Sequence, residues 1–150
     1  MWISTRAQYG MRALIEIAIN GDAPISLKVV SERQKISQHY LEQLVSLMRR
    51  AGIVESVRGA YGGYRLARPM TQISALEVVE LLEGSLAPVT CIDDEDNCER
   101  TGHCATEPLW RRVDQAVRAV LGSASLADLV AEKNQLLQLE ALPEQFSSVN

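Results

Sequence analysis

The residues best suited to chemistry are Cys91, Cys98 and Cys104, the only cysteines of this 150-residue chain, which lie together in CIDDEDNCERTGHC. An odd number of closely spaced cysteines argues against a disulfide framework and indicates metal or redox chemistry. Thiolates are soft ligands that suit iron–sulfur clusters and zinc. The spacing C-x6-C-x5-C lacks the close C-x2-C pair of a zinc ribbon, so it favours a cluster, with zinc as an alternative.

Acidic residues surround these cysteines: Asp93, Asp94, Glu95, Asp96 and Glu99. Nearby negative charge raises the pKa of a thiol and disfavours the reactive thiolate, whereas a bound metal cation reverses that balance. The segment therefore favours metal binding, and a thiol switch stays open as a second alternative.

Capping and turn residues indicate the elements that must position the cysteines. We expect a first helix that Ser4 or Thr5 caps and that ends at the turn at Asn20. Further helices are expected from Ser26 to about Gln34, from Ser37 to Gly52, from Ser74 to about Gly84, from Thr106 to about Leu121 and from Ser125 onward. Ser74 and Glu77 match a capping box. Two short strands, at 53–57 and 64–66, flank a glycine-rich loop. The cysteine segment is expected to be a loop.

This pattern predicts a mainly α fold with a small β-hairpin wing: a winged helix-turn-helix followed by a long C-terminal dimerisation helix. The expected regions are 1–70 for the winged helix-turn-helix, 71–90 for a connecting helix, 91–107 for a cluster-binding loop, 108–142 for the dimerisation and C-terminal helices, and 143–150 for a flexible tail.

The charge distribution is uneven along the chain. Residues 1–70 hold ten Lys and Arg against five Asp and Glu, and residues 71–150 hold five against fourteen. A basic half joined to an acidic half predicts a polyanion-binding module with a separate control region, although chance unevenness on a solvated surface is the simpler alternative. The N-terminus lacks the layout of a signal peptide and Glu16 interrupts the best apolar run, so we expect a cytoplasmic protein without membrane spans.

The third helix and the hairpin are the expected DNA-binding parts. The exposed face of the helix offers Gln38, His39, Glu42, Gln43, Ser46 and Arg49. Gln pairs with an adenine edge, and Glu accepts from cytosine. Lys28, Arg49 and Arg50 are expected phosphate contacts, and Tyr40 either touches the DNA backbone or packs inward. A solvated polar face is the alternative for each of these residues.

The hairpin loop RGAYGGY places Arg58 among glycines. Gly59, Gly62 and Gly63 let the backbone approach a phosphate or a groove wall closely, and an arginine suits a narrow minor groove. The alternative is that these glycines only supply positive φ in a turn.

The stretches SERQKIS, HYLEQLVSLMRRAGIVESVRGAYGGYRL and ALEVVELLEG, with the later LW…V…AV…VL…LADL pattern, resemble the winged-helix regulator family that includes IscR, NsrR and CymR. The resemblance covers roughly residues 1–135. It implies a homodimer built on the long helix, with a seam at Leu109, Val113, Ala116 and Val120, and a pseudo-palindromic double-stranded DNA operator. The alternative for that seam is intrachain core.

The wing looks closest to CymR, but CymR-like proteins lack the three cysteines. IscR-like and NsrR-like members carry three cysteines in this loop and bind an iron–sulfur cluster there, and the spacing does not separate the two. The resemblance to IscR implies a 2Fe–2S cluster, so an IscR-like regulator of cluster biogenesis is the favoured prediction. The histidine of the IscR-like C-x-x-H is replaced here by Glu107, the expected fourth ligand; His103, a partner-chain residue or an exogenous ligand is the alternative. In IscR-like proteins the glutamate at the position of Glu42 is implicated in operator discrimination.

Three other functions stay open. These are an NsrR-like nitric-oxide-sensing repressor with a 4Fe–4S cluster, a CymR-like regulator of cysteine metabolism and, in another class, a cluster-carrying redox protein. The wing, the predicted recognition helix and the basic half argue against the redox protein. No nucleophile–base set is visible, so an enzyme is not expected.

Overall fold

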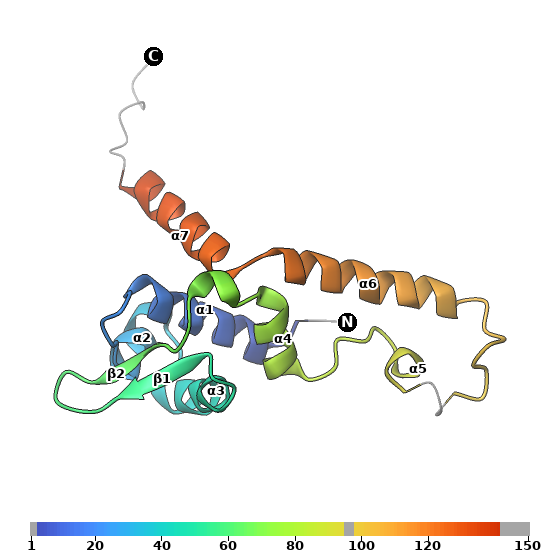
Figure 1. Cartoon of the computed structure of the whole chain (residues 1–150), viewed down its shortest axis with the longest axis horizontal. Coiled ribbons are helices and arrows are strands. Elements are labelled where there is room, and N and C mark those ends of the chain that lie inside the picture. The colour runs from blue at the N-terminus through green and yellow to red at the C-terminus, as the bar shows by residue number, and fades with distance from the viewer. Residues whose placement is uncertain (1–2, 95–97, 142–150) are drawn as a thin grey trace, which may run out of the picture.

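The computed structural model describes residues 3–94 and 98–141 (Figure 1). The expectations for Glu95, Asp96, residue 142 and the tail 143–150 lie outside the described residues.

Three helices make up the N-terminal part of the chain. They are α1 (Thr5–Ile19), α2 (Leu27–Gln34) and α3 (Gln38–Arg50). Each begins where the sequence predicts, because the hydroxyl oxygens of Ser4, Ser26 and Ser37 accept hydrogen bonds from backbone N–H groups three residues later. The connection between α2 and α3 is short, as a helix-turn-helix requires.

The hairpin follows directly after α3. Strand β1 (Val54–Val57) pairs antiparallel with β2 (Gly63–Leu66), so each begins within one residue of the predicted start. Tyr64 also exchanges two backbone hydrogen bonds with Ile25, each 2.9 Å long. Because Ile25 directly precedes the cap of α2, the wing is attached to the start of the helix-turn-helix.

The C-terminal part is helical. It contains the 3-10 helix η1 (Met70–Gln72), α4 (Ala75–Glu83), the short α5 (Thr90–Asp93), α6 (Glu107–Ser123) and α7 (Leu126–Glu140). The prediction that the whole cysteine segment is a loop was therefore wrong, since Cys91 lies in α5. The backbone can close this turn because Asp94 N–H bonds the Thr90 carbonyl. None of the described helices is long and apolar enough to cross a membrane.

The predicted capping box at the start of α4 forms only in part. Ser74 accepts from the Glu77 N–H at 3.1 Å, but the Glu77 carboxylate pairs with the Arg68 guanidinium. The ion pair with Arg68 therefore uses the Glu77 side chain that would otherwise complete the capping box. A complete capping box instead begins α7, between Ser125 and Asp128.

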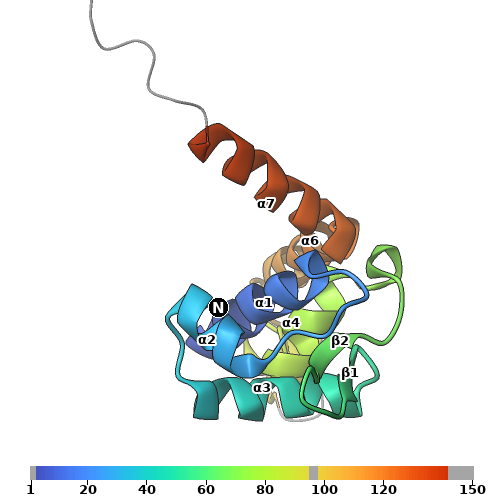
Figure 2. The ribbon, with the colours of Figure 1, turned by 90° about the vertical axis from the view of Figure 1, so that its left-hand side faces the viewer.

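The core lies between α1, α3 and α4. Leu14, Ile17, Leu41, Met48 and Leu82 are among its fully buried side chains. In contrast, α6 has no buried residue along its length. Two views show α3 along the edge opposite α7, with the hairpin beside it (Figures 1 and 2). The architecture is the predicted mainly α fold with a two-stranded wing.

Candidate nucleic-acid interface and cysteine site

The outer face of α3 carries the predicted base-reading residues. Gln38, His39, Glu42, Gln43, Arg49 and Arg50 are exposed, and Ser46 is half-buried. Their opposite face is buried in the core, which fixes which side of the helix meets solvent. The Gln38 amide donates to Glu42 at 3.4 Å, and the side chains of His39 and Gln43 lie 3.3 Å apart. Two polar contacts between side chains four residues apart thus lie along this face.

Tyr40 is half-buried and turned toward α1. Its ring meets the Tyr9 ring edge-on, with centroids 6.2 Å apart, and the Arg12 guanidinium lies over Tyr9 at 5.2 Å. Of the two orientations considered for Tyr40, the structure has the inward one. The predicted phosphate contact Lys28 is exposed on α2.

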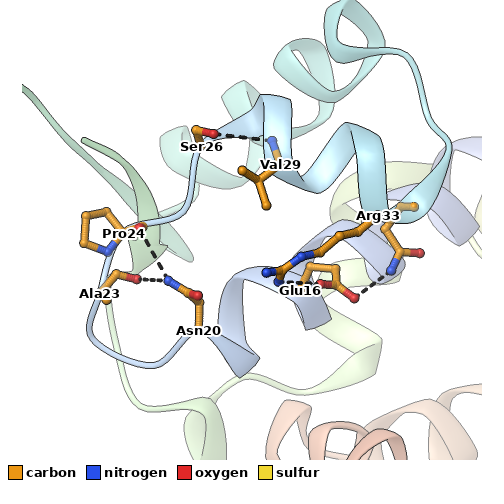
Figure 3. Close-up of polar contacts among 8 residues, drawn as sticks. Glu16, Asn20, Ala23, Pro24, Ser26, Val29 and Arg33 are labelled. Carbon is orange, nitrogen blue, oxygen red and sulfur yellow. Dashed lines mark hydrogen bonds and ion pairs between the residues drawn. The ribbon is translucent and has the colours of Figure 1, made fainter. Parts of the chain in front are cut away.

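A polar network joins α1 to the end of α2 (Figure 3). Glu16, which is 7% exposed, accepts a hydrogen bond from Gln34 at 2.7 Å and pairs with Arg33 at 3.4 Å. A buried carboxylate needs such partners, because desolvation without them is costly. The network positions the turn before α3, and sequence reasoning missed it because its contacts span 17 and 18 residues.

The wing glycines have structural partners of their own. A Cβ at Gly62 would lie 2.2 Å from the Val57 carbonyl oxygen, and one at Gly63 would lie 2.3 Å from the Ile25 carbonyl oxygen. Gly59 has φ +118 with open space around it. Close approach within the chain therefore explains Gly62 and Gly63, and positive φ explains Gly59; their contact with DNA remains a prediction.

Two side chains project from the wing loop. Arg58 is exposed and has no ion pair among the described residues. Tyr61 is 94% exposed, and sequence reasoning did not select it. The sequence feature that could have identified Tyr61 is an aromatic residue inside a glycine-rich loop of a basic region.

The predicted dimer seam lies on the outer side of α6. Leu109 and Val120 are 44% and 69% exposed, Ala116 is exposed, and Val113 is half-buried. An apolar groove of about 370 Å³ runs beside them, lined by Ile3, Ala116, Val117, Val120 and Leu121. These exposures run against the intrachain-core alternative for Leu109, Ala116 and Val120.

The three cysteines are free thiols, each half-exposed, on α5, on the following loop and just before α6. Partial burial raises the pKa of Cys91, and the neighbouring Cys98 thiol adds to that rise. The pKa of Cys104 is lowered, because the Thr106 hydroxyl and the backbone N–H groups of Thr106 and Glu107 stabilise its thiolate. The expectation that local acidity disfavours thiolate is therefore wrong for Cys104, whose surroundings are those of a helix N-terminus.

Glu107, the expected fourth ligand, is the first residue of α6. Its Oε1 accepts from Arg111 at 2.8 and 3.0 Å, and its Oε2 accepts from the Gly102 N–H at 3.3 Å. These bonds, led by that from Arg111, lower the pKa of Glu107. His103 is exposed. Among the described residues, no three His, Cys, Asp or Glu side chains are arranged to hold a metal ion, so the thiols are neighbours without a preassembled cage.

Comparison with known proteins gives concordant results. The family model Rrf2, described as an iron-dependent transcriptional regulator, matches residues 3–132. The HTH-type transcriptional regulator CymR of Bacillus subtilis (strain 168) is 43% identical over 132 residues, which cover 87% of this chain and 91% of CymR. The solved structure of CymR, the global cysteine regulator of B. subtilis, matches with a TM-score of 0.74 and 42% identity, covering 88% of this chain and 98% of that one. The solved structure of T. potens IscR matches with a TM-score of 0.74 and 36% identity, and the match covers 91% of this chain and 90% of that one.

These relatives are transcriptional regulators and not enzymes, in agreement with the absence of a catalytic set in the sequence. The winged-helix fold and the DNA-binding class predicted from the hairpin and α3 are confirmed. Both CymR and IscR are similar over nearly the whole chain, so similarity alone does not distinguish their two roles. The chain belongs to the Rrf2 family of transcriptional regulators.

Proposed function

We propose that this protein is an iron–sulfur-cluster-sensing transcriptional regulator that binds pseudo-palindromic DNA as a homodimer in the cytoplasm. The observation that carries the proposal is that Cys91, Cys98 and Cys104 are free, partly exposed thiols between α5 and the start of α6, with Cys91 and Cys98 close enough to interact. Regulation of cluster-biogenesis genes is the favoured role, as in IscR-like proteins.

The donor set fits a cluster. Three thiols are the soft ligands that iron–sulfur clusters take, and the lowered pKa of Cys104 favours the thiolate form that ligates iron. Glu107 is the proposed fourth ligand. It would offer Oε2, whose one hydrogen bond within the described residues is the 3.3 Å bond from Gly102, while Oε1 keeps Arg111. A carboxylate is a harder ligand than imidazole, so His103 stays the alternative.

A bound cluster, proposed to be 2Fe–2S, would supply a redox-labile group whose presence reports the iron–sulfur supply of the cell. The residues of this chain then carry the response. Cys104 lies three residues before Glu107, so ligation there constrains the start of α6. Loss of that constraint changes which operators the two DNA-binding units fit.

A homodimer would bring together two copies of the proposed recognition helix, α3. The exposed apolar stripe of α6, with Leu109, Ala116 and Val120, is the proposed contact between two copies, because apolar area of this kind is stabilised by burial. Two copies of α3 then reach half-sites about one DNA turn apart. Glu42 is proposed to select among operators, because it accepts from cytosine and repels phosphate.

A CymR-like regulator of cysteine metabolism is the second candidate. The resemblance of the wing RGAYGGY to that of CymR-like proteins and the 43% identity to CymR favour it, while the three cysteines favour the cluster sensor. An NsrR-like nitric-oxide sensor with a 4Fe–4S cluster, and a redox protein that does not act on DNA, are the remaining alternatives.

The test is metal analysis of anaerobically purified protein, with iron and sulfide per chain, absorption and EPR spectra. We expect about two irons and two sulfides per chain, lost in Cys91→Ser, Cys98→Ser and Cys104→Ser. Glu107→Ala and His103→Ala then assign the fourth ligand. Four irons would move the assignment to the nitric-oxide sensor. Zinc alone, or no metal after anaerobic reconstitution, would overturn the cluster and leave the CymR-like role.

A further inference from the structure

The wing tip carries a large side chain that the proposed function does not use. Tyr61 is 94% exposed, more than any other large apolar side chain described. The other exposed ones, such as Ile3, Leu109 and Val120, lie at the N-terminus, on α6 or on α7. Tyr61 therefore stands apart from the apolar surface proposed for dimerisation.

The glycines beside Tyr61 are used within the chain. Gly62 donates its N–H to the Gly59 carbonyl at 3.1 Å and lies too close to the Val57 carbonyl for a Cβ. Gly63 is packed in the same way against Ile25. The loop side chains that point to solvent are those of Arg58, Ala60 and Tyr61, so contact with a partner falls to them.

The wing holds this tip in place. Arg65 pairs with its cross-strand neighbour Glu55 at 2.6 Å, and the backbone bridge between Tyr64 and Ile25 ties β2 to the start of α2. Figure 1 shows the loop projecting beyond both strands, away from α6. A tyrosine has only two χ angles to order on binding, so a fixed backbone presents it at little entropic cost.

We propose that Tyr61 is a DNA-backbone contact, with its hydroxyl donating to a phosphate oxygen and its ring packing on the adjacent deoxyribose. The loop from Arg58 to Tyr64 contains no acidic residue and one cation, Arg58, so it attracts phosphate. Tyrosine adds a neutral donor and an apolar face where arginine adds charge. The inference rests on DNA binding through the wing and is independent of the cluster.

The two kinds of contact differ in their dependence on salt. A cationic side chain that binds a phosphate releases counterions from the DNA. Removing that side chain therefore lowers the magnitude of the slope of log K against log salt by about 0.9. A phenol releases none. Tyr61→Phe should therefore weaken binding by roughly 3- to 10-fold, the usual range for one hydrogen bond, with an unchanged salt slope. Tyr61→Ala should weaken it further, and Arg58→Ala should make the slope less steep.

The experiment is fluorescence anisotropy at several salt concentrations, with one duplex selected from a random pool by the unaltered protein and one unrelated duplex. A backbone contact predicts the same loss on both duplexes. Tyr61→Phe that binds like the unaltered protein overturns the hydroxyl contact, and a loss confined to the selected duplex replaces it with a base contact. If the unaltered protein selects no duplex, the proposed function fails instead. Melting temperatures should not change, since Tyr61 is 94% exposed.

Discussion

Arg12 of α1 donates two hydrogen bonds to Gln34, the last residue of α2: Nε reaches Oε1 at 2.9 Å and Nη2 reaches the main-chain carbonyl at 2.5 Å. The end of a helix leaves carbonyl groups without partners inside the helix. One arginine on a neighbouring helix therefore helps to end α2 and to fix where the turn toward α3 begins.

Arg12→Ala should lower the free energy of unfolding by about 1 kcal/mol, because solvent can replace part of what the arginine donates. The measurement is urea denaturation, with an unchanged m-value as a check that the denatured state is the same. Arg6→Ala is the matched control, since Arg6 is an exposed arginine on the same helix. Equal effects of the two substitutions would contradict a role in ending α2.

Glu16 allows a sharper comparison. Glu16→Ala should cost about 1–3 kcal/mol, because it leaves the Gln34 amide without its acceptor in a part-buried site. Glu16→Gln keeps an oxygen acceptor and loses only the charge pairing with Arg33, a side chain that is 52% exposed, so its cost should be smaller. Equal losses in the two variants would mean that charge, not hydrogen bonding, holds the network.

Lys35 is the one non-glycine residue with positive φ in the described chain, at 56°. Left-handed backbone is unfavourable for a residue with a Cβ, and glycine is preferred after a helix. Lys35→Gly should therefore stabilise the protein by about 0.5–1 kcal/mol. Lys35→Ala, which keeps the Cβ, should give no gain in the same urea experiment. Stabilisation by both would point to the charge of Lys35 instead.

Gly10 lies where α1 meets α4. A Cβ there would be 2.3 Å from the Leu82 Cδ1 and 3.4 Å from the Met48 Cε, and both of these side chains are buried. Gly10→Ala should destabilise by about 1–2 kcal/mol, since overpacking outweighs the gain in helix propensity.

Gly122 of α6 is the control for that substitution. Its nearest contact would be Leu76 at 3.7 Å, so Gly122→Ala should be neutral or stabilising. A methyl at Gly10 should also cost less when Leu82→Ala makes room for it, which a double-mutant cycle would detect. Additive effects would show that the two sites do not share the space.

The capping box of α7 gives a pH prediction. Hydrogen bonds from the Ser125 hydroxyl and N–H lower the pKa of Asp128 in the folded protein. A lowered folded pKa means that the stabilisation is complete above the unfolded pKa of about 3.9 and is lost as pH falls through the folded value. Asp128→Asn should remove this acid-dependent part, so the two unfolding free energies should converge toward low pH. A constant difference down to the acid limit would contradict it.

The sequence predicted those features that depend on near neighbours. Ser4, Ser26, Ser37, Ser74 and Ser125 all cap helices as their local patterns indicated. A cap needs only the next three residues, so the information is local. The exposed face of α3 was predictable for a similar reason, because helical periodicity separates its apolar side from its polar side.

Contacts between distant residues were not predictable in this way. Gly63 faces Ile25, and Glu77 turns to Arg68, because of partners that no local pattern reveals. The pKa of Cys104 is a different case: the groups that lower it, Thr106 and Glu107, are near neighbours, and the prediction considered only the acidic residues around the thiol. Cluster binding and the fourth ligand stay predictions, because they concern a group beyond the chain itself.

The attachment of α6 has a mechanical consequence. Ala75 N–H bonds the Ala124 carbonyl at 2.8 Å and Arg118 pairs with Glu80, so the helix is held near its C-terminal end. Its 17 residues span about 25 Å, so a tilt of one degree about that end moves Glu107 by roughly 0.4 Å. Any movement of the end near Cys104 would therefore reach α4 with a smaller amplitude, and α4 packs directly on α1.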